Sequence, residues 1–420
     1  MSNIRDILLL QKRELDRVES GNYIQREVDY KKFNFPLIKV IIGPRRAGKS
    51  FLAYHIIKKS GNFGYVNFDD ERIIEMENYD EIITSLNSLY NNPGNFLFDE
   101  IQNLKNWELF VNRLHREGYN IIITGSNSNL LSKDLATHLT GRHIPVIIFP
   151  FSFKEYLKAE EKELTELEIR NKFRDYSVYG GYPEPLVKNI DYKDYLSTLF
   201  DSILFKDIVK KFNIRFVSGI EDLALFLISN VGKEFSYNTL TKLTKCKSVH
   251  TVQKYLNYFE EAFIFFRVNR FSYKLKQQIL SEKKIYCIDP GFVYAKGVKL
   301  TPDVGRLYEN VFAIFLKKLE MEGKIKFYYW KTPSGKEVDF VVEKERRIVQ
   351  LIQVCYDLTD PKTKMRECAS LISASKIFGC SNLVVLTDSY ENIEEVEWQK
   401  IKREIKFIPL WKFLTGGENV

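Results

Sequence analysis

The sequence is poor in cysteine and has no long hydrophobic run, and each absence excludes a class of protein. Its 420 residues include five cysteines (Cys246, Cys287, Cys355, Cys368 and Cys380), none of them in a CxxC pair, which argues against a disulfide scaffold and against a zinc site. No apolar run approaches the roughly 20 residues that span a bilayer, and the segment after Met1 is charged and amphipathic, unlike a secretory signal. We therefore expect a soluble, cytoplasmic protein with no membrane partner and reduced cysteines.

The sequence also lacks a strong excess of either charge. It has 63 Lys and Arg residues against 55 Asp and Glu residues, a formal net charge of +8. Such a mild excess suits a polyanionic partner but does not identify one, because the clustering of charge decides binding. What the chain does have is length and 45% hydrophobic residues, enough for about two to four domains with buried cores.

The first third of the chain alternates apolar runs with helical stretches, which is the pattern of a parallel sheet covered by helices. The expected strands are residues 37–42, 64–68, 96–98, 120–124 and 145–149. Five such strands complete an α/β core with a parallel sheet, to which we assign residues 1–150.

Three further regions follow this core. Residues 151–213 are helical, with faces rich in Glu and Lys and a break at YGGYPEP (residues 179–185). Residues 214–289 have three helical patterns followed by two strand-like runs, which is the order of a winged helix. Residues 290–420 begin with a helix and three strand-like runs, which fit a second small α/β domain. The chain as a whole is therefore expected to be α/β.

One segment of the first region fits a phosphate-binding pattern. Residues 43–50, GPRRAGKS, fit GxxxxGK[ST] and stand between a strand-like run, LIKVII, and a helical pattern. Glycines let backbone N–H groups wrap a phosphate at a helix N-terminus, while Lys49 neutralises the outer phosphates and the Ser50 hydroxyl can ligate Mg²⁺. The residues expected around the nucleotide are Gly43, Pro44, Arg45, Arg46, Ala47, Gly48, Lys49, Ser50 and Phe51. The context favours an ATP site over a chance glycine turn.

A pair of acids, Asp99 and Glu100, follows the third expected strand. In P-loop ATPases the first acid of such a pair holds Mg²⁺ through water, and the second orients and polarises the attacking water. Alone, an apolar run before two acids indicates only a strand that enters a solvated loop; about fifty residues after a P-loop it indicates hydrolysis. We assign the metal to Ser50 and Asp99, and catalysis to Lys49 and Glu100.

Two more residues are candidates for catalysis. The fourth strand runs into small polar residues, of which Asn127 or Ser126 could contact the γ-phosphate or the water; the competing interpretation is a plain polar turn. Arg142, just before the fifth strand, could stabilise the charge of the transition state from the same subunit or from a neighbour. The competing interpretation is a surface arginine.

Several segments carry a resemblance to a known family. GPRRAGKS, FLFDEIQ, ITGSNSNLL, GRHIPVIIFPFSFKEYL and YGGYPEP resemble the microbial AAA+-type ATPases related to the signal-transducing STAND NTPases. GRLYENVFAIFL and YYWKTPSGKEVDFVV resemble the C-terminal domain of that family, so the resemblance covers nearly the whole chain. It implies a five-stranded AAA+ core (1–150), a helical lid (151–213), a winged helix (214–289) and a domain similar to restriction-endonuclease-like nucleases (290–420). It implies no particular cellular role.

Basic residues cluster in the expected winged helix. They flank or lie on the expected recognition helix or decorate the expected wing: Lys242, Lys245, Lys247, Lys254, Arg267, Arg270, Lys274, Lys276, Lys283 and Lys284. The residues that we expect to contact DNA are Lys245, Lys247, Lys254, Arg267, Arg270, Lys274 and Lys276. Such a cluster can neutralise phosphates while a helix in a groove sets the register on DNA. The alternative is a packing or oligomerisation module whose basic face is only solvated.

Acidic residues of the last domain resemble part of the PD-(D/E)xK nuclease pattern, in which carboxylates gather Mg²⁺ beside the scissile phosphate. Glu309 lies on an expected helix and Asp339 on an expected strand, but the next strand has Gln353 in place of the third acid and no lysine after it. These losses argue against cleavage, although Lys331 or Lys336 could replace the lysine in space. We therefore expect a degenerate domain that binds nucleic acid or a partner.

Together these patterns predict a Mg²⁺-dependent, ATP-hydrolysing switch or motor of the AAA+ type that acts on DNA or is regulated by it. Two alternatives stay open. One is a STAND-like signalling switch that binds other proteins without DNA, with ATP setting only its conformation, and the other is a metal-dependent nuclease under ATP control. A homo-oligomer or a protein partner also stays open. ATP and ADP are the expected ligands in each case.

Overall fold

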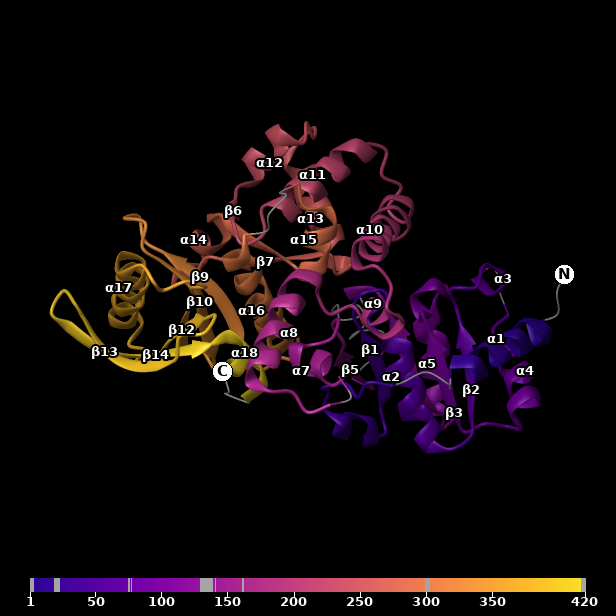
Figure 1. Ribbon diagram of the computed structural model, residues 1–420. Coiled ribbons are helices and arrows are strands. Elements are labelled where there is room, and N and C mark those ends of the chain that lie inside the picture. Colours follow the sequence, from indigo (N-terminus) through magenta and orange to yellow (C-terminus); the bar gives the residue numbers. More distant parts are fainter. Residues whose placement is uncertain are drawn as a thin grey trace. The chain divides into compact units, whose positions relative to one another are not determined.

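The structure, a computed structural model, describes residues 4–18, 23–74, 76, 78–128, 139, 141–160, 162–298 and 303–416 (Figure 1). The chain divides into two compact units, Met1–Pro150 with Glu261–Phe263 and Phe151–Glu260 with Ile264–Val420. None of the described helices is both long enough and apolar enough to cross a membrane. All five cysteines are buried free thiols.

The first unit is built on a parallel sheet of five strands: β1 (Ile38–Ile42), β2 (Phe63–Asn67), β3 (Asn95–Asp99), β4 (Asn120–Gly125) and β5 (His143–Ile147). Their order is β2-β3-β4-β1-β5, and every neighbouring pair is parallel. The predicted five-stranded parallel sheet is therefore confirmed. Strand β1 is buried along its whole length, as expected of a central parallel strand.

Helices cover this sheet: α1 (Ile4–Val18), α2 (Lys49–Ile57), α3 (Glu71–Ile74), α4 (Asp80–Tyr90) and α5 (Trp107–Arg116), with 3₁₀ turns at Tyr30–Asn34, Lys58–Ser60 and Ile101–Asn103. α1 packs on β2, where the Gln11 amide donates to the Asn67 carbonyl (3.0 Å) and its oxygen accepts from the Asn67 N–H (3.0 Å). Because the strands are parallel, the carboxyl ends of β1, β3 and β4 lie at one edge of the sheet, where ligands of such folds bind.

The second unit begins with four helices, α7 (Phe153–Leu157), α8 (Glu166–Tyr179), α9 (Pro183–Lys188) and α10 (Tyr192–Ser202), and a π-helical stretch (Ile203–Lys210). Capping boxes at Ser152 and Thr165 start α7 and α8. The sequence predicts a lid here. Within the second unit these helices pack on the C-terminal domain, where Asp388 accepts hydrogen bonds from Arg174 (3.0 Å) and Arg170 of α8.

Helices and short strands alternate in the next part of the second unit. They are α11 (Val217–Ser229), β6 (Glu234–Phe235), α12 (Tyr237–Leu243), α13 (Val249–Glu261), β7 (Phe265–Asn269), α14 (Leu275–Leu280), β8 (Lys283–Cys287) and α15 (Pro290–Lys296). The three strands form an antiparallel sheet in the order β6-β8-β7. The three predicted helices and two predicted strands are present. No sequence pattern predicts β6, because it is only two residues long.

The C-terminal domain contains a mixed sheet of six strands. Its elements are α16 (Val304–Met321), β9 (Lys326–Lys331), β10 (Glu337–Lys344), β11 (Arg347–Val354), α17 (Pro361–Phe378), β12 (Leu383–Thr387), β13 (Asn392–Trp398), β14 (Ile401–Pro409) and α18 (Leu410–Gly416). The order is β13-β14-β12-β11-β10-β9, parallel at β11-β12 and β12-β14 and antiparallel elsewhere. Helix α17 packs Leu371 and Ile372 against Val338, Leu351 and Val385 of the sheet.

Candidate functional site

The turn between β1 and α2 (residues 43–48) requires glycine at two positions. Gly48, which caps α2, has a φ of 90°, in the left-handed region. A Cβ atom on Gly43 would lie 1.7 Å from the carbonyl oxygen of Ile148, because the chain after β5 passes directly over the turn. Gly48 provides no side chain to cap α2, which suits a helix whose first N–H groups bind an anion.

Lys49 is the first residue of α2, and its side chain contacts the turn and faces the acid pair. Only 3% of its surface is exposed. Its Nζ donates to the Pro44 carbonyl (2.9 Å) and lies 3.6 Å from Glu100 Oε1. The structure thus brings the lysine and the second acid together, although they are far apart in the sequence.

Asp99, the last residue of β3, faces the same turn. Its Oδ1 accepts hydrogen bonds from the Ser50 hydroxyl (2.8 Å) and from the Thr124 hydroxyl at the end of β4. A serine hydroxyl and a carboxylate are oxygen ligands of the kind that Mg²⁺ prefers. The donor set of Ser50 and Asp99 therefore fits the predicted metal.

Glu100 is held from several sides. Its backbone has a φ of 51°, and its N–H donates to Thr124 Oγ1 (3.1 Å). Its Oε2 accepts hydrogen bonds from Ser126 Oγ (2.9 Å) and Gln102 Nε2 (2.5 Å). One carboxylate oxygen therefore faces Lys49 while the other is fixed by neutral side chains, and the orientation of the carboxylate is defined.

The pKa values of the two acids move in opposite directions. Burial and the adjacent Glu100 carboxylate raise the pKa of Asp99, although hydrogen bonds from two hydroxyls oppose the rise. Burial would also raise the pKa of Glu100, but Lys49 and two side-chain hydrogen bonds outweigh it and hold that pKa below its ordinary value. Glu100 is therefore the more readily ionised acid, as its contact with the ammonium requires.

Three supporting residues have little or no sequence signal. Thr124 holds both acids, but a threonine at the end of an isoleucine-rich strand is an ordinary strand residue. Gln102 fixes the second acid from a 3₁₀ turn. Arg26, which is buried, donates to the Ala47 carbonyl of the turn (2.6 Å) and to the Phe149 carbonyl beyond β5. Its partners lie 21 and 123 residues away, so no local pattern marks it.

The two remaining catalytic candidates lie at opposite edges of the sheet. Asn127 follows β4, at the edge that carries the turn. Arg142 precedes β5, and its carbonyl accepts from the Ile38 N–H (2.9 Å) at the start of β1. The length of β1, roughly 16 Å at about 3.3 Å per residue, separates it from the turn. Arg142 therefore does not reach phosphates bound at its own turn, which leaves a role in a neighbouring subunit or on the surface.

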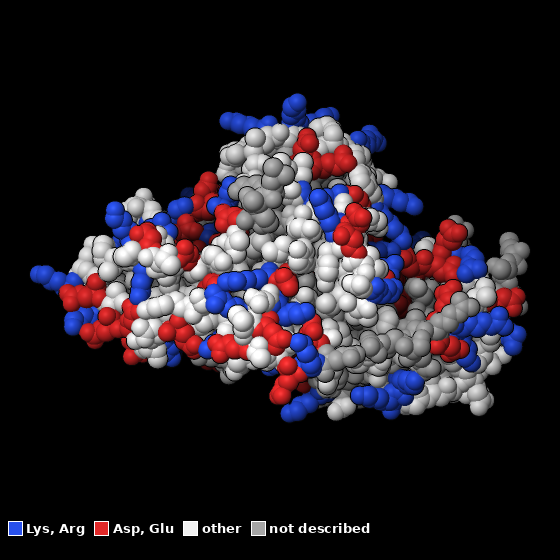
Figure 2. Space-filling view, in the orientation of Figure 1, with Lys and Arg blue, Asp and Glu red and all other residues white. Residues whose placement is uncertain are grey.

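The predicted DNA-binding residues fall into two groups. Five lysines are exposed: Lys245, Lys247, Lys254, Lys274 and Lys276. The two arginines are engaged inside the unit, because Arg267 Nε donates to Glu260 Oε1 (2.9 Å) and Arg270 donates to the Lys331 carbonyl. Figure 2 shows Lys and Arg side chains projecting over α11 and α12 at the top of the view.

In the C-terminal domain the structure brings Glu309 and Asp339 together around a third residue. Lys284, on β8, places its Nζ 2.8 Å from Glu309 Oε1 and 3.2 Å from Asp339 Oδ1. Gln353, the third residue of the predicted site, makes its hydrogen bonds elsewhere than to the side-chain oxygens of Glu309 and Asp339. Its Oε1 accepts from the Asp339 N–H (3.2 Å), and its Nε2 donates to Glu367.

The two lysines expected as substitutes take other positions. Lys331 Nζ lies 3.3 Å from Glu337 Oε2 and pairs with Glu234. Lys336 Nζ donates to Ser373 Oγ on α17 (2.7 Å). Neither lies between Glu309 and Asp339, so Lys284 is the residue that takes that place.

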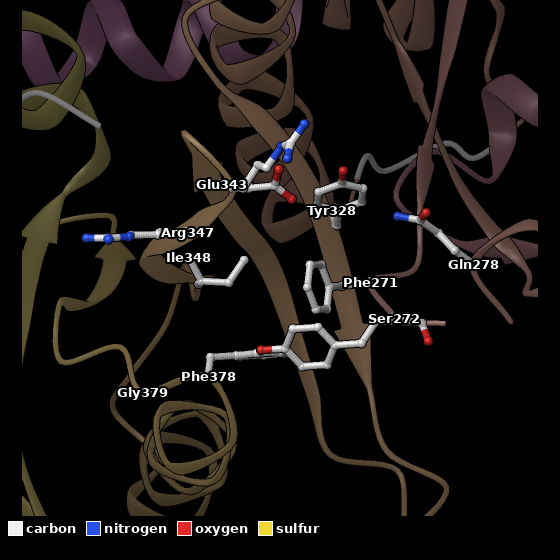
Figure 3. Close-up of a pocket in the computed structure, with 11 residues that line it drawn as sticks. Phe271, Ser272, Gln278, Tyr328, Glu343, Arg347, Ile348, Phe378 and Gly379 are labelled. Atoms are coloured by element: carbon white, nitrogen blue, oxygen red, sulfur yellow. The ribbon is translucent and has the colours of Figure 1, made fainter. Parts of the chain in front are cut away.

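An aromatic pocket of about 500 Å³ lies next to α14. The Phe271 ring stands between Tyr328 and Phe378 (Figure 3), with ring centroids 5.3 and 5.1 Å apart. Arg346 and Arg347 contribute cationic groups to its lining. The sequence gives no sign of this pocket, because its walls come from four separate segments: residues 271–278, β9, the β10–β11 hairpin and the end of α17.

Comparison with protein families matches three parts of the chain. Residues 36–157 match the family described as AAA domain. Residues 170–301 and 304–413 match two domains of unknown function, DUF8612 and DUF4143. The AAA match supports a nucleotide-binding ATPase domain of the P-loop type, in agreement with that part of the sequence prediction.

Relatives of similar length exist in an archaeon and a bacterium. Uncharacterized protein MJ1544 of Methanocaldococcus jannaschii is 33% identical, with 98% of this chain and 99% of that protein aligned. An uncharacterized protein of Haemophilus influenzae is 32% identical, with 82% of this chain and 88% of that protein aligned. Neither name states an activity, so these relatives indicate shared descent and leave the function to the site.

Proposed function

This chain belongs to the family of MJ1544 from Methanocaldococcus jannaschii and carries an AAA domain, and from that premise we propose that it is a Mg²⁺-dependent ATPase that converts ATP and water to ADP and phosphate. One observation carries the proposal. The first two residues of α2, which follow the glycine turn, contact the acid pair: Ser50 Oγ lies 2.8 Å from Asp99 Oδ1, and Lys49 Nζ lies 3.6 Å from Glu100 Oε1.

Each residue of the site has a part in the proposed reaction. Backbone N–H groups of residues 43–50 bind the phosphate oxygens, and Lys49 exchanges its contact with Glu100 for the outer phosphates. Ser50 and Asp99 hold Mg²⁺, which when bound neutralises phosphate charge. Glu100, held in place by its neutral neighbours, orients the attacking water and accepts its proton. Asn127, at the end of β4, contacts the γ-phosphate or that water.

We propose that Arg142 acts on the site of a neighbouring copy. Its position at the amino edge of the sheet supports action on another copy over action at its own site, and the side chain is exposed, so a second copy can contact it. An arginine supplied in this way stabilises the charge of the transition state. The active form is then a homo-oligomer in which each site is completed by the next subunit.

We further propose that residues 214–289 are a winged helix that binds DNA. The order of α11, β6, α12, α13, β7 and β8 supports this assignment, with α13 as the helix that enters a groove. The five exposed lysines named above supply the charge. If each neutralises one phosphate, the logarithm of the affinity falls with the logarithm of the salt concentration with a slope of about −4 to −5.

One observation favours a second function, the binding of a protein by the same unit. The segment from Tyr273 to Leu280 exposes four large apolar side chains: Tyr273 (74%), Leu275 (68%), Ile279 (63%) and Leu280 (74%). Exposed apolar side chains in one short stretch are more typical of a protein contact than of a phosphate contact. A STAND-like switch would use this surface without DNA.

An ATPase assay with no DNA and with single-stranded, duplex and branched DNA separates the two functions. A DNA-dependent motor hydrolyses faster with one of these forms, and a variant with Lys245, Lys247 and Lys254 changed to Ala loses the stimulation and flattens the salt dependence of binding. A rate indifferent to all forms, together with no binding at low salt, refutes the DNA proposal and leaves the ATPase proposal intact.

A further inference from the structure

The acid cluster of the C-terminal domain consists of Glu309 on α16 and Glu337 and Asp339 on β10, and a buried ammonium lies among them. Lys284 Nζ is 2.8 Å from Glu309, 2.7 Å from Glu337 and 3.2 Å from Asp339. Its side chain is only 4% exposed. A nuclease of this fold would hold a divalent metal among such carboxylates, so the lysine takes the place of a cation.

Electrostatics keep this lysine charged. Burial on its own would lower the pKa of Lys284, but the carboxylates, Glu309 foremost, outweigh burial and raise the pKa well above its ordinary value. A buried ammonium within 3.2 Å of three carboxyl groups is a paired charge. The cluster therefore already contains a cation at the position that a metal would take.

Each acid of the cluster also has a protein partner other than Lys284. The Tyr286 hydroxyl donates to Glu309 Oε1 (2.6 Å), and the Val354 N–H donates to Asp339 Oδ2 (3.0 Å). Across the described part of the chain, no three or more His, Cys, Asp or Glu side chains are arranged to hold a metal ion. The donor set thus does not fit the metal that the nuclease-like pattern implies.

We propose that Lys284 is the permanent cation of this cluster and that the C-terminal domain does not bind a divalent metal there. Its ion pairs hold the β6-β8-β7 sheet against α16 and β10. A second contact between the same parts supports this packing, because the Phe271 N–H donates to the Tyr329 carbonyl of β9 (2.7 Å). The candidate DNA-binding helix α13 and the C-terminal sheet then move as one body.

Thermal unfolding with and without Mn²⁺ tests this proposal. All proteins carry Asp99→Asn, so that metal bound at the P-loop does not contribute, and no nucleotide is added. In this parent protein Mn²⁺ is expected to leave the melting temperature of the second unit unchanged. Lys284→Ala is expected to melt at lower temperature, and Mn²⁺ to restore part of the loss by occupying the vacated cluster. Lys254→Ala, which removes an exposed lysine of α13, is the matched control and follows the parent.

Two results would overturn the proposal. One is a rise of the parent's melting temperature with Mn²⁺ that is lost in Asp339→Asn, because the wild-type cluster would then bind metal. The other is a Lys284→Ala protein as stable as the parent. If Lys284→Ala does not fold, the comparison of the parent with Asp339→Asn still decides, because it needs no change at the lysine. None of these outcomes depends on ATP hydrolysis.

Discussion

Thr124→Val is expected to slow ATP hydrolysis by about 10- to 150-fold without unfolding the protein. Thr124 is completely buried (0% exposed), and its hydroxyl donates to Asp99 and accepts from the Glu100 N–H (3.1 Å). Valine keeps the shape of the side chain but makes neither hydrogen bond. A hydrogen bond to a charged group contributes about 1.5–3 kcal/mol, and about 1.36 kcal/mol corresponds to a factor of ten in rate, which gives this range.

Phosphate release, measured over a range of Mg²⁺ concentrations at saturating ATP, checks this prediction. The Mg²⁺ concentration for half-maximal rate should rise as well, because Asp99 loses the group that orients it. Thr244→Val is the control: that threonine is also buried (1% exposed) and donates to the Leu240 carbonyl (2.8 Å), but it lies on the other unit. A Thr124→Val enzyme with the kcat and Mg²⁺ dependence of the wild type would refute the role assigned to this hydroxyl.

Three further predictions concern other parts of the chain. Gly43→Ala should lower the melting temperature and abolish ATP binding, since its Cβ would lie 1.7 Å from a backbone oxygen. Gly94→Ala is the control, because nothing lies within 4 Å of the added carbon and neither glycine has a positive φ. Equal ATP binding by both variants would contradict the close approach at Gly43. Lys49→Ala and Arg142→Ala should each be inactive alone and regain part of the ATPase activity when mixed. In a mixed oligomer, a subunit that keeps Lys49 can lie beside a subunit that keeps Arg142, and together they form an intact site. A mixture as inactive as its components would argue against action in trans. Burial outweighs two backbone hydrogen bonds and raises the pKa of Asp289 to about 7, so the folded state binds a proton at this carboxyl more tightly than the unfolded state does. The contribution of the protonated carboxyl to folding stability is fully present below about pH 4 and is lost as the pH rises to 7. The wild type should therefore lose up to about 4 kcal/mol of unfolding free energy over that interval relative to Asp289→Asn in denaturant titrations, and parallel pH profiles would disprove the shift.

The core of the site is predictable from the sequence because its determinants are local. The glycines, Lys49 and Ser50 follow one strand directly, and Asp99 and Glu100 follow another, so the parallel topology alone places them at one edge. The same argument, applied to the arginine before the fifth strand, would have placed Arg142 at the opposite edge.

Residues that depend on contacts between distant segments could not be predicted. Arg26 clamps the turn through carbonyl groups, and a carbonyl group is present at every position of every sequence. In the sequence, Lys284 cannot be told from the other basic residues of the expected wing. Two of its carboxylate partners lie 25 and 55 residues further along the chain, so no local pattern links them to it. Its burial among them becomes visible only when β8 is placed against α16 and β10.

The rate of Mg²⁺-dependent phosphate release from ATP, compared between the wild type and Glu100→Gln, tests the central claim most directly. The amide keeps the shape of the carboxylate but cannot accept the proton of the attacking water, so we expect nucleotide binding to persist while hydrolysis falls by at least about 100-fold. Hydrolysis by Glu100→Gln at the wild-type rate would contradict the assignment of residue 100 and of the site built around it.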